Sequence, residues 1–394
     1  MKKEKIRLLV TASTFPRWRE DTEPRFVFDL VKHLDNEFDV TVLVPWAPGS
    51  KEKEILEGVN ILRYHYFPIH KMETLCYPGA ILPRIEEKKA RILLVPFLFL
   101  SLWFNLLVRV NKYDIVHAHW IIPQGIIQSL FKKPYIVTGH GGDVTSLNNR
   151  LIFTLKKRCL KRAKYVTVVS EYLKEKVCDI IPETKVKVIS MGVDTGNFGK
   201  RFRIDNYFNQ GNRKVVLFVG RLVEKKGIKY LIEAMERIDA VLVIVGTGPL
   251  EKELKTKSKK IENRIRFLGN KSHNELKKIY SSSDIFVAPS VIAKNGDQEG
   301  LPTTILEAMA SDIPVIASNY GGMKELITSY KNGILCDPGS VEQIAMAIKR
   351  LCCDEKLYEE IVKNARMTIK EYDYENIAKQ FSEIIRYVNM AYSK

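Results

Sequence analysis

The chain has 394 residues, more than one hydrophobic core usually accommodates, so we expect two domains. Hydrophobic residues make up 45% and charged residues 28% of the sequence, which excludes a disordered chain. The net charge of +17 favours anionic partners, although a merely soluble, lysine-rich surface would carry the same charge. The six cysteines include no Cys-x-x-Cys pair and the first apolar run is too short for a signal peptide, so we expect a cytoplasmic protein with reduced thiols.

Short runs rich in valine, isoleucine and leucine recur through the chain, as in parallel strands that are covered on both faces. In the first half they predict strands at Ile6–Ser13, Val40–Pro45, Val59–Phe67, Asp114–His119, Tyr135–Gly141, Tyr165–Ser170 and Lys185–Ser190. In the second half they predict strands at Val215–Arg221, Ala240–Gly248, Ile265–Gly269, Asp284–Ser290, Pro314–Ser318 and Gly333–Asp337. Amphipathic stretches such as Val223–Ile238 and Val341–Cys352 predict helices between them. This alternation predicts an α/β fold with doubly wound, Rossmann-like sheets.

The regular pattern lapses between Gly192 and Arg213, where the sequence is polar and rich in glycine and asparagine. We place the domain boundary there, with an N-terminal domain at 1–200 and a C-terminal domain at 201–372. Two such domains are expected to face each other across a cleft. Ligands of open α/β sheets bind beyond the carboxyl ends of the strands, so we look for chemistry there.

The segment Ile92–Val108 is almost entirely apolar, but it contains Pro96 and Asn105 and is shorter than the ~20 residues of a membrane span. One interpretation is a buried helix of the first domain. The other is a helix with one face in a bilayer, whose anionic head groups would meet the basic residues in 84–91. The second interpretation predicts peripheral contact with the cytoplasmic face of a membrane.

His117 and His119 alternate on one strand face near its carboxyl end. A histidine pair can bind a metal, but no third ligand is evident and no metal-ligand cluster of the usual spacing occurs in the sequence. We therefore expect no metal, and interpret the pair as residues that line a cleft or pack in the core. His119 or Trp120 is a candidate for acceptor contact.

The first candidate binding motif is VGRLVEKKG, residues 219–227, directly after a predicted strand. Gly220 permits a tight exit from the strand. Arg221 and Lys226 follow on the loop, where two cations could hold a diphosphate without a metal. An ordinary surface loop with basic residues is the alternative.

The second motif is EGLPTTILE, residues 299–307. Pro302 suits the first position of a helix, and the free N–H groups of a first turn form an anion site. Glu299 precedes this helix and Glu307 lies on it, so the two carboxylates can reach different parts of one ligand and accept hydrogen bonds from sugar hydroxyls. For Glu307 alone, a solvent-facing position would be the simpler interpretation.

These motifs together resemble the retaining GT-B glycosyltransferases of family four. VGRLVEKKG resembles that family's phosphate-gripping motif and EGLPTTILE its Glu-x7-Glu motif. Further similarities run from about the first strand to the last helix, at HGGD (140–143), MGVD (191–194) followed by Phe198, GTGP (246–249) and YGG (320–322). The resemblance implies a GT-B architecture and a final helix, 373–394, that crosses back onto the N-terminal domain.

The resemblance also implies roles for individual residues. Arg221 and Lys226 would neutralise the leaving diphosphate, Glu307 would take the ribose hydroxyls, and Glu299 would hold hydroxyls of the transferred sugar. His140 would contact the sugar or distal phosphate near the reacting carbon, and Asp143 would order the loop around it. Backbone groups of Gly300, Leu301, Pro302 and Thr303 would contact phosphate or sugar oxygens, and the loop Leu268–Lys271 would lie against the base.

One loop departs from the family's pattern. Many relatives place two glycines after the first strand, where the backbone approaches the diphosphate, but Phe15–Phe26 contains no glycine. Arg17, Arg19 or Arg25 would then contact anionic groups or recognise the acceptor. Exposed loop cations without a ligand are the alternative.

The resemblance implies a hexosyltransferase that works without cofactor or metal. It would use a UDP-sugar or GDP-mannose and a sugar or lipid-linked glycan acceptor, and retain the anomeric configuration. One alternative is a nucleotide-sugar epimerase of the same architecture, although the intact motif pair favours transfer. Another is a basic, non-enzymatic membrane scaffold. Nucleic acid is not expected as a partner, because clusters such as Lys156–Arg158 have no interleaved aromatic platform.

Overall fold

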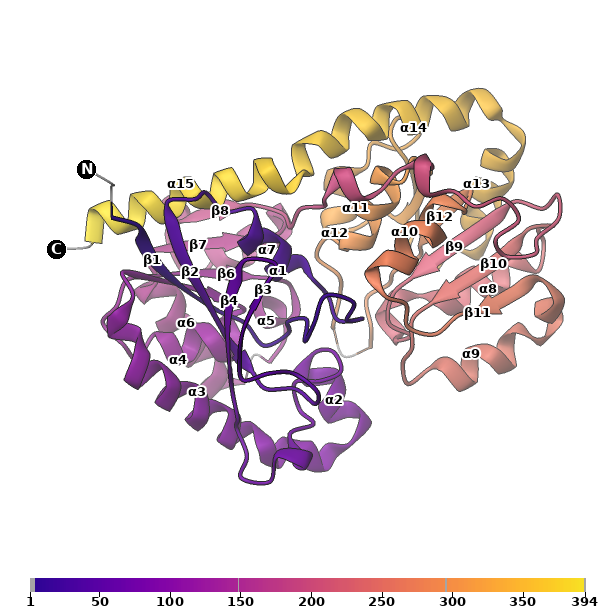
Figure 1. Cartoon of the computed structure of the whole chain (residues 1–394). Coiled ribbons are helices and arrows are strands. Elements are labelled where there is room, and N and C mark those ends of the chain that lie inside the picture. The colour runs from indigo at the N-terminus through magenta and orange to yellow at the C-terminus, as the bar shows by residue number, and fades with distance from the viewer. Residues whose placement is uncertain (1–3, 148, 295, 393–394) are drawn as a thin grey trace. The chain divides into compact units, whose positions relative to one another are not determined.

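The computed structural model describes residues 4–147, 149–294 and 296–392, and the chain divides into two compact units. Unit 1 takes the chain up to Met191 and again from Tyr374 onward, and unit 2 takes Gly192–Asp373. Each unit has its own sheet with helices packed on it (Figure 1). The predicted fold class, two doubly wound Rossmann-like α/β sheets, is confirmed.

The sheet of unit 1 has eight strands in the order β3-β4-β2-β1-β5-β6-β7-β8. The strands are β1 (Ile6–Thr11), β2 (Phe38–Pro45), β3 (Lys53–Leu56), β4 (Val59–Tyr64), β5 (Ile115–His119), β6 (Tyr135–Gly139), β7 (Tyr165–Val168) and β8 (Val186–Val188). All neighbours are parallel except β3 and β4, which form an antiparallel pair at one edge. The sequence pattern missed β3, because this short edge strand buries no residue fully and therefore carries no apolar run.

The main helices of unit 1 are α1 (Phe26–Lys32), α2 (Ile81–Glu87), α3 (Val95–Arg109), α4 (Ile126–Gln128), α5 (Gly142–Thr145), α6 (Arg150–Arg162), α7 (Glu171–Cys178) and α15 (Tyr374–Tyr392). Helix α15 comes from the end of the chain and packs against α1, β5 and β6. Its buried residues recur every three or four positions, as in Ile377, Phe381 and Ile385. They form one apolar face, by which the helix packs against unit 1.

The segment predicted as a helix at 92–108 forms a 3-10 turn, Lys89–Leu94, followed by α3. By length and composition, Lys89–Lys112 could cross a membrane, although such a helix is weak evidence for a span. Only Leu98, Leu102 and Leu106 of α3 are buried. The interpretation as a buried helix therefore holds for one face of α3 and is wrong for the rest.

The sheet of unit 2 has six strands in the order β11-β10-β9-β12-β13-β14, and all its pairs are parallel. The strands are β9 (Val215–Val219), β10 (Val241–Val245), β11 (Ile265–Phe267), β12 (Ile285–Ala288), β13 (Val315–Ser318) and β14 (Ile334–Cys336). Every residue of β9, β10, β12 and β13 is buried, which explains their continuous apolar sequences. Because the strands are parallel, their carboxyl ends lie at one edge of the sheet.

The main helices of unit 2 are α8 (Ile228–Met235), α9 (Glu251–Lys257), α10 (His273–Ser281), α11 (Thr303–Ala310), α12 (Gly321–Leu326), α13 (Val341–Cys353) and α14 (Glu355–Ile369). The predicted helix at Val341–Cys352 is confirmed. The predicted helix at Val223–Ile238 is wrong in its first five residues, since Glu224–Lys226 form a 3-10 turn and Gly227 interrupts the helix with φ +64°.

The break at Gly227 has a steric cause. A Cβ atom on Gly227 would lie 1.9 Å from the carbonyl oxygen of Pro289, and the positive φ also disfavours any side chain. The backbone after β12 thus approaches the turn that carries Lys226. Glycine is required for the two loops to meet.

Gly227→Ala should therefore lower the free energy of unfolding of unit 2 by more than backbone strain alone. Gly269→Ala is the matched control, because Gly269 has a similar φ of +67° but open space at its Cβ position. We expect the control to lose about 1–2 kcal/mol of unfolding free energy, because alanine is strained in the left-handed backbone. We expect Gly227→Ala to lose about 2 kcal/mol or more beyond that, because its Cβ atom also clashes. Urea denaturation measures both, and equal losses would contradict this packing.

Candidate functional site

The candidate donor site lies at the carboxyl edge of the sheet of unit 2. Strand β9 ends at Val219, and the chain leaves it through Gly220 into the half-buried Arg221. The neighbouring strand β10 leaves through Gly246, where a Cβ atom would lie 2.1 Å from the carbonyl oxygen of Gly220. The exits of adjacent strands therefore pack backbone against backbone, which fixes the loop that carries Arg221 and Lys226.

Glu299 is the charged centre of this edge. Its carboxylate lies 3.2 Å from Nζ of Lys226 and 3.5 Å from Nζ of Lys225, and only 12% of the side chain is exposed. Burial alone would raise the pKa of Glu299, but the ammonium groups of Lys226 and Lys225 lower it to about 2. Glu299 is therefore ionised and serves as a hydrogen-bond acceptor throughout the physiological pH range.

Lys225 and Asp297 belong to the same cluster and were missed in the sequence. Nζ of Lys225 lies 3.0 Å from the carboxylate of Asp297. Burial lowers the pKa of Lys225, but Glu299 and Asp297 more than compensate and raise it. The adjacent lysines in EKKG were the available signal for this cluster. The sequence pattern predicted an α-helix from Val223, but a 3-10 turn presents the two side chains differently from an α-helix.

Glu307 lies on α11 and is oriented by a buried tyrosine. The hydroxyl of Tyr280 donates to Oε2 of Glu307 at 2.8 Å, and Tyr280 itself is fully buried. Burial, and next the charge of Glu307, raise the pKa of the Tyr280 phenol, so this group stays a donor. Glu307 is thus half-buried and positioned, which argues against the interpretation as a solvent-facing residue.

The segment between the two glutamates runs close to α12. Pro302 is not the first residue of α11, as predicted, but the residue before it, with ψ 124°. The N–H of Gly322 donates to the carbonyl oxygen of Gly300 at 3.2 Å, and a Cβ atom on Gly322 would lie 2.9 Å from that oxygen. The YGG motif therefore supports Gly300, Leu301 and Thr303 at the start of α11.

The loop expected to face the base, Leu268–Lys271, follows β11 at the same edge. The carbonyl oxygen of Gly269 accepts a hydrogen bond from Gly246 at 2.8 Å. Lys271 pairs with Glu275 at 3.1 Å, beside the capping box of α10. The loop is thereby tied to the exit of β10.

In unit 1, His140 follows β6 and Asp143 organises the backbone around it. The carboxylate of Asp143 accepts backbone N–H groups from His140 at 2.9 Å, Gly141 at 3.0 Å and Ile121 at 2.8 Å. Gly141 has φ 140°, a conformation that glycine alone adopts readily. Asp143 thus joins the exits of β5 and β6, as the role suggested for it requires.

Three histidines of unit 1, His117, His119 and His140, form a cluster. Nδ1 of His119 lies 3.1 Å from Nε2 of His140, whereas Nε2 of His119 is buried without a hydrogen-bond partner. A buried N–H without a partner costs more than an unmet acceptor, so His119 carries its hydrogen on Nδ1 and donates it to His140. His140 then presents its own N–H at Nδ1. Burial lowers the pKa of His117 and of His140 to about 3, and both are neutral.

Aromatic rings surround His140. The ring of Trp120 lies 4.7 Å and that of Phe26 5.2 Å from it, measured between centroids. Trp120 has φ 72°, an unfavourable conformation for a residue with a side chain. This strained residue at the end of β5 therefore joins His140 and Phe26 in an aromatic wall.

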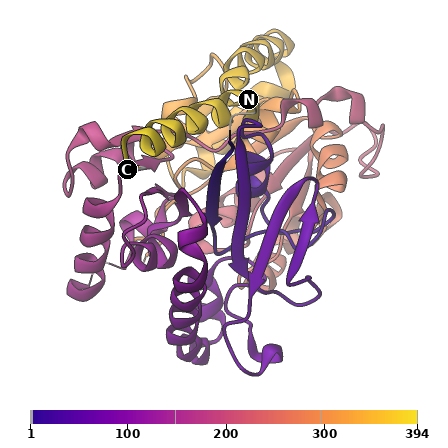
Figure 2. The ribbon, with the colours of Figure 1, turned by 60° about the vertical axis from the view of Figure 1, so that its left-hand side comes forward.

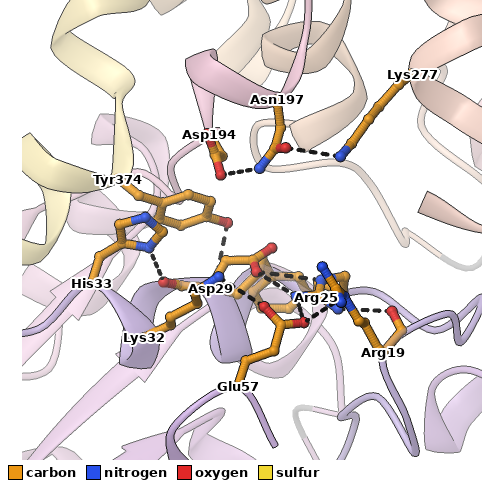
Figure 3. Close-up of polar contacts among 11 residues, drawn as sticks. Arg19, Arg25, Asp29, Lys32, His33, Glu57, Asp194, Asn197, Lys277 and Tyr374 are labelled. Carbon is orange, nitrogen blue, oxygen red and sulfur yellow. Dashed lines mark hydrogen bonds and ion pairs between the residues drawn. The ribbon is translucent and has the colours of Figure 1, made fainter. Parts of the chain in front are cut away.

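The arginines of the glycine-free loop are mostly engaged within unit 1. Arg17 donates to Asp21 and to the carbonyl oxygen of Pro48. Arg25 bonds Asp29 and Glu57 and donates to the carbonyl oxygen of Arg19 (Figure 3). The side chains of Arg17 and Arg25 are 12% and 9% exposed, whereas that of Arg19 is 76% exposed. Nε of Arg19 lies 3.8 Å from the carboxylate of Glu57, and Arg19 is the member of this set whose guanidinium is exposed to a ligand.

No group of three or more histidine, cysteine, aspartate or glutamate side chains suited to a metal ion occurs among the residues that the structure describes. The positive charge beside Glu299 comes from Lys225 and Lys226.

Comparisons with known proteins agree with this geometry. Residues 24–197 match the model of Glycosyltransferase Family 4, and residues 200–368 match that of Glycosyl transferases group 1. An uncharacterised glycosyltransferase of Methanocaldococcus jannaschii is 32% identical over 354 residues, which covers 84% of this chain and 85% of that protein. A GDP-mannose-dependent phosphatidylinositol monomannoside mannosyltransferase of Mycobacterium tuberculosis is 33% identical over 48% of this chain and 52% of its own length.

The solved structure of Anabaena HepE in complex with UDP-glucose shares the fold, with a TM-score of 0.71 and 19% identity over 97% of this chain and all of that one. The two Rossmann-like units and these matches define a glycosyltransferase of the GT-B fold. The chain belongs to glycosyltransferase family 4.

The lowered pKa of Glu299 predicts how the free energy of unfolding depends on pH. Because the folded-state pKa, about 2, lies below the unfolded-state value, 4.5, this carboxylate stabilises the fold above pH 4.5, and the contribution is lost as pH falls from 4.5 toward 2. Between pH 5 and 3, the free energy of unfolding should fall more steeply in the wild type than in Glu299→Gln, by up to about 1.4 kcal/mol per pH unit.

Urea denaturation across this pH range measures the difference in slope. Glu262→Gln, at an exposed position of the same unit, is the control and should follow the wild type. Parallel slopes for Glu299→Gln and the wild type would contradict the ion-pair assignment.

Proposed function

We propose that this glycosyltransferase transfers a hexose from a nucleoside diphosphate sugar to a hydroxyl of a sugar or lipid-linked glycan, with retention of anomeric configuration. The acceptor would be a growing polysaccharide, glycolipid or glycoprotein glycan. The observation that carries the proposal is Glu299, held ionised between Lys225 and Lys226 at the strand ends of unit 2, with Glu307 oriented beside the same sheet edge by Tyr280.

The cluster suits a donor with two anionic phosphates and many hydroxyls. Arg221 and Lys226 are assigned to the diphosphate, because cations are its natural partners. Glu299 is assigned to hydroxyls of the transferred sugar and Glu307 to the ribose. The mannosyltransferase relative is named for GDP-mannose and the HepE structure holds UDP-glucose, so UDP-sugars and GDP-mannose are the donors to test first.

The protonation state of Glu299 supports retention. A carboxylate with a pKa of about 2 that is paired with two lysines is a weak base and a poor nucleophile. The leaving phosphate is then the base: the bond from C1 to the phosphate oxygen breaks, the acceptor oxygen bonds C1, and the acceptor's proton passes to that phosphate. Departure and attack on one face of the sugar retain the configuration.

The acceptor is assigned to the strand ends of unit 1. There His140 offers an N–H beside the rings of Trp120 and Phe26, and Arg19 offers an exposed guanidinium. His140 is also assigned to the transferred sugar or its phosphate, since it is neutral and therefore donates without adding charge. We further propose that the reaction takes place in the cytoplasm. We also propose that it needs no metal, because Arg221 and Lys226 supply the charge that a metal would otherwise supply.

The donor is identified by a thermal-shift panel of UDP-, GDP- and ADP-sugars, because a ligand that binds the folded state raises the melting temperature. Transfer is then followed with the labelled donor and mixed acceptors. We expect label in a larger glycan, an unchanged anomer by NMR, and activity that survives EDTA. Label that stays on the nucleotide would instead indicate an epimerase.

Arg221→Ala and Glu307→Ala should lower kcat/KM about 10²–10³-fold, the loss that follows removal of a group acting on developing charge or on substrate position. Lys324→Ala and Glu325→Gln, both exposed on α12, are the matched controls and should retain activity. Circular dichroism confirms folding of each variant. Unchanged turnover in Arg221→Ala and Glu307→Ala would refute the assigned site.

A further inference from the structure

Helix α3 is apolar apart from one polar stripe, Ser101, Asn105 and Arg109, and it packs into unit 1 by one narrow face. Leu98, Leu102 and Leu106 recur every fourth residue and are at most 1% exposed. The hydroxyl of Ser101 donates to the carbonyl oxygen of His65 at 2.6 Å, and the ring of Phe97 packs edge-on against that of Phe67 with their centroids 4.9 Å apart. These contacts fix the helix along the outside of the unit (Figure 2).

The outer face of the same segment is also apolar and is exposed. Leu93 and Leu100 are 71% and 62% exposed, and the full set is Ile92, Leu93, Phe97, Leu100, Trp103, Phe104, Leu107 and Val108. A soluble helix normally turns charged or polar residues outward, and large contiguous apolar patches on a protein surface mark interaction sites. The outer face of α3 therefore requires a partner of apolar chemistry.

A second helix supplies charge next to this face. Helix α4 packs against both α3 and α6, and the three lie side by side in unit 1 (Figure 1). The sequence of α6 contains no aspartate or glutamate. Its exposed residues are Thr154, two apolar side chains, Leu151 and Phe153, and the cations Arg150, Lys157, Arg158, Lys161 and Arg162.

Exposed Lys88, Lys89 and Lys112 stand at the two ends of the α3 segment. The nearby carboxylate of Glu87 is paired with Arg84 and Arg91, so it offsets those arginines rather than these lysines. Apolar side chains at the centre and cations around them match a bilayer with anionic head groups.

We propose that the outer faces of α3 and α6, the lipid-facing surface, dock unit 1 onto an anionic bilayer, with α3 lying in the plane of the interface. A spanning orientation would remove Leu98, Leu102 and Leu106 from the core. A symmetric contact with a second copy of the chain would bring the same cations of α6 toward one another. The anionic bilayer satisfies both the apolar face and the charge, and the inference is independent of the donor chemistry in unit 2.

The test is flotation of the full chain with vesicles of phosphatidylcholine alone or mixed with phosphatidylglycerol. We expect binding to the mixed vesicles that weakens with salt and is far weaker on phosphatidylcholine. Lys157→Gln/Arg158→Gln/Lys161→Gln should lower partitioning about fivefold per charge, or roughly 100-fold in total. Leu100→Gln/Phe104→Ser/Leu107→Gln, at exposed positions, should abolish binding that persists at high salt.

Matched controls in unit 2 are Lys252→Gln/Lys259→Gln and Met346→Gln/Met367→Gln, all at exposed positions. They should bind vesicles like the wild type. The nucleotide thermal shift of every variant should stay unchanged, which separates a failure of docking from a failure of the donor site. Two results would overturn the proposal: equal flotation of wild type and α3 variant, or light scattering that shows a dimer lost in the α3 variant without vesicle binding.

Discussion

The ion pair of Glu299 with Lys225 and Lys226 is the interaction on which the candidate donor site depends. A buried carboxylate is stable only when charged partners and hydrogen bonds replace water, and the two adjacent lysines provide them. In return, the carboxylate keeps two lysines close together on a short turn. The chemistry assigned to the edge follows from this balance: the site holds positive charge for a phosphate and an ionised acceptor for hydroxyls.

Backbone packing is what brings these charges together. The approach of Gly227 to Pro289 joins the turn after β9 to the strand exit of β12, and Gly246 joins the exits of β9 and β10. In unit 1, Asp143 has the corresponding role, because its carboxylate binds the backbone after β5 and β6 at once. In both units, the loops that contain candidate site residues are held in place by contacts between neighbouring strand exits.

Much of the fold was predictable because the central strands of each sheet are buried on both faces and carry continuous apolar sequences. The edge strand β3 lacks that signal. The positions of Glu299, Lys226 and Arg221 at strand ends followed from the same pattern. The participation of Lys225, Asp297 and Tyr280 did not, because it depends on a 3-10 turn and on contacts between residues far apart in the chain.

The loop arginines show a second limit of sequence. Arg17, Arg19 and Arg25 have the same side chain and lie within nine residues, yet two are buried in ion pairs and one is exposed. The carboxylates that decide this, Asp21, Asp29 and Glu57, are common surface residues without a motif. Likewise, the sequence of α3 could not reveal that one apolar face alone is covered, since leucine and phenylalanine also occupy the face that stays exposed.

Calorimetric titration of Glu299→Gln with the preferred nucleoside diphosphate, and with the corresponding nucleotide sugar, tests the central claim most directly. Under the proposed assignment, Glu299 of the wild type competes with phosphate for Lys226 and holds the sugar. The account predicts that the variant binds the nucleoside diphosphate at least as tightly as the wild type and loses the added affinity for the sugar. An equal weakening of both ligands, or no change in either, would contradict it.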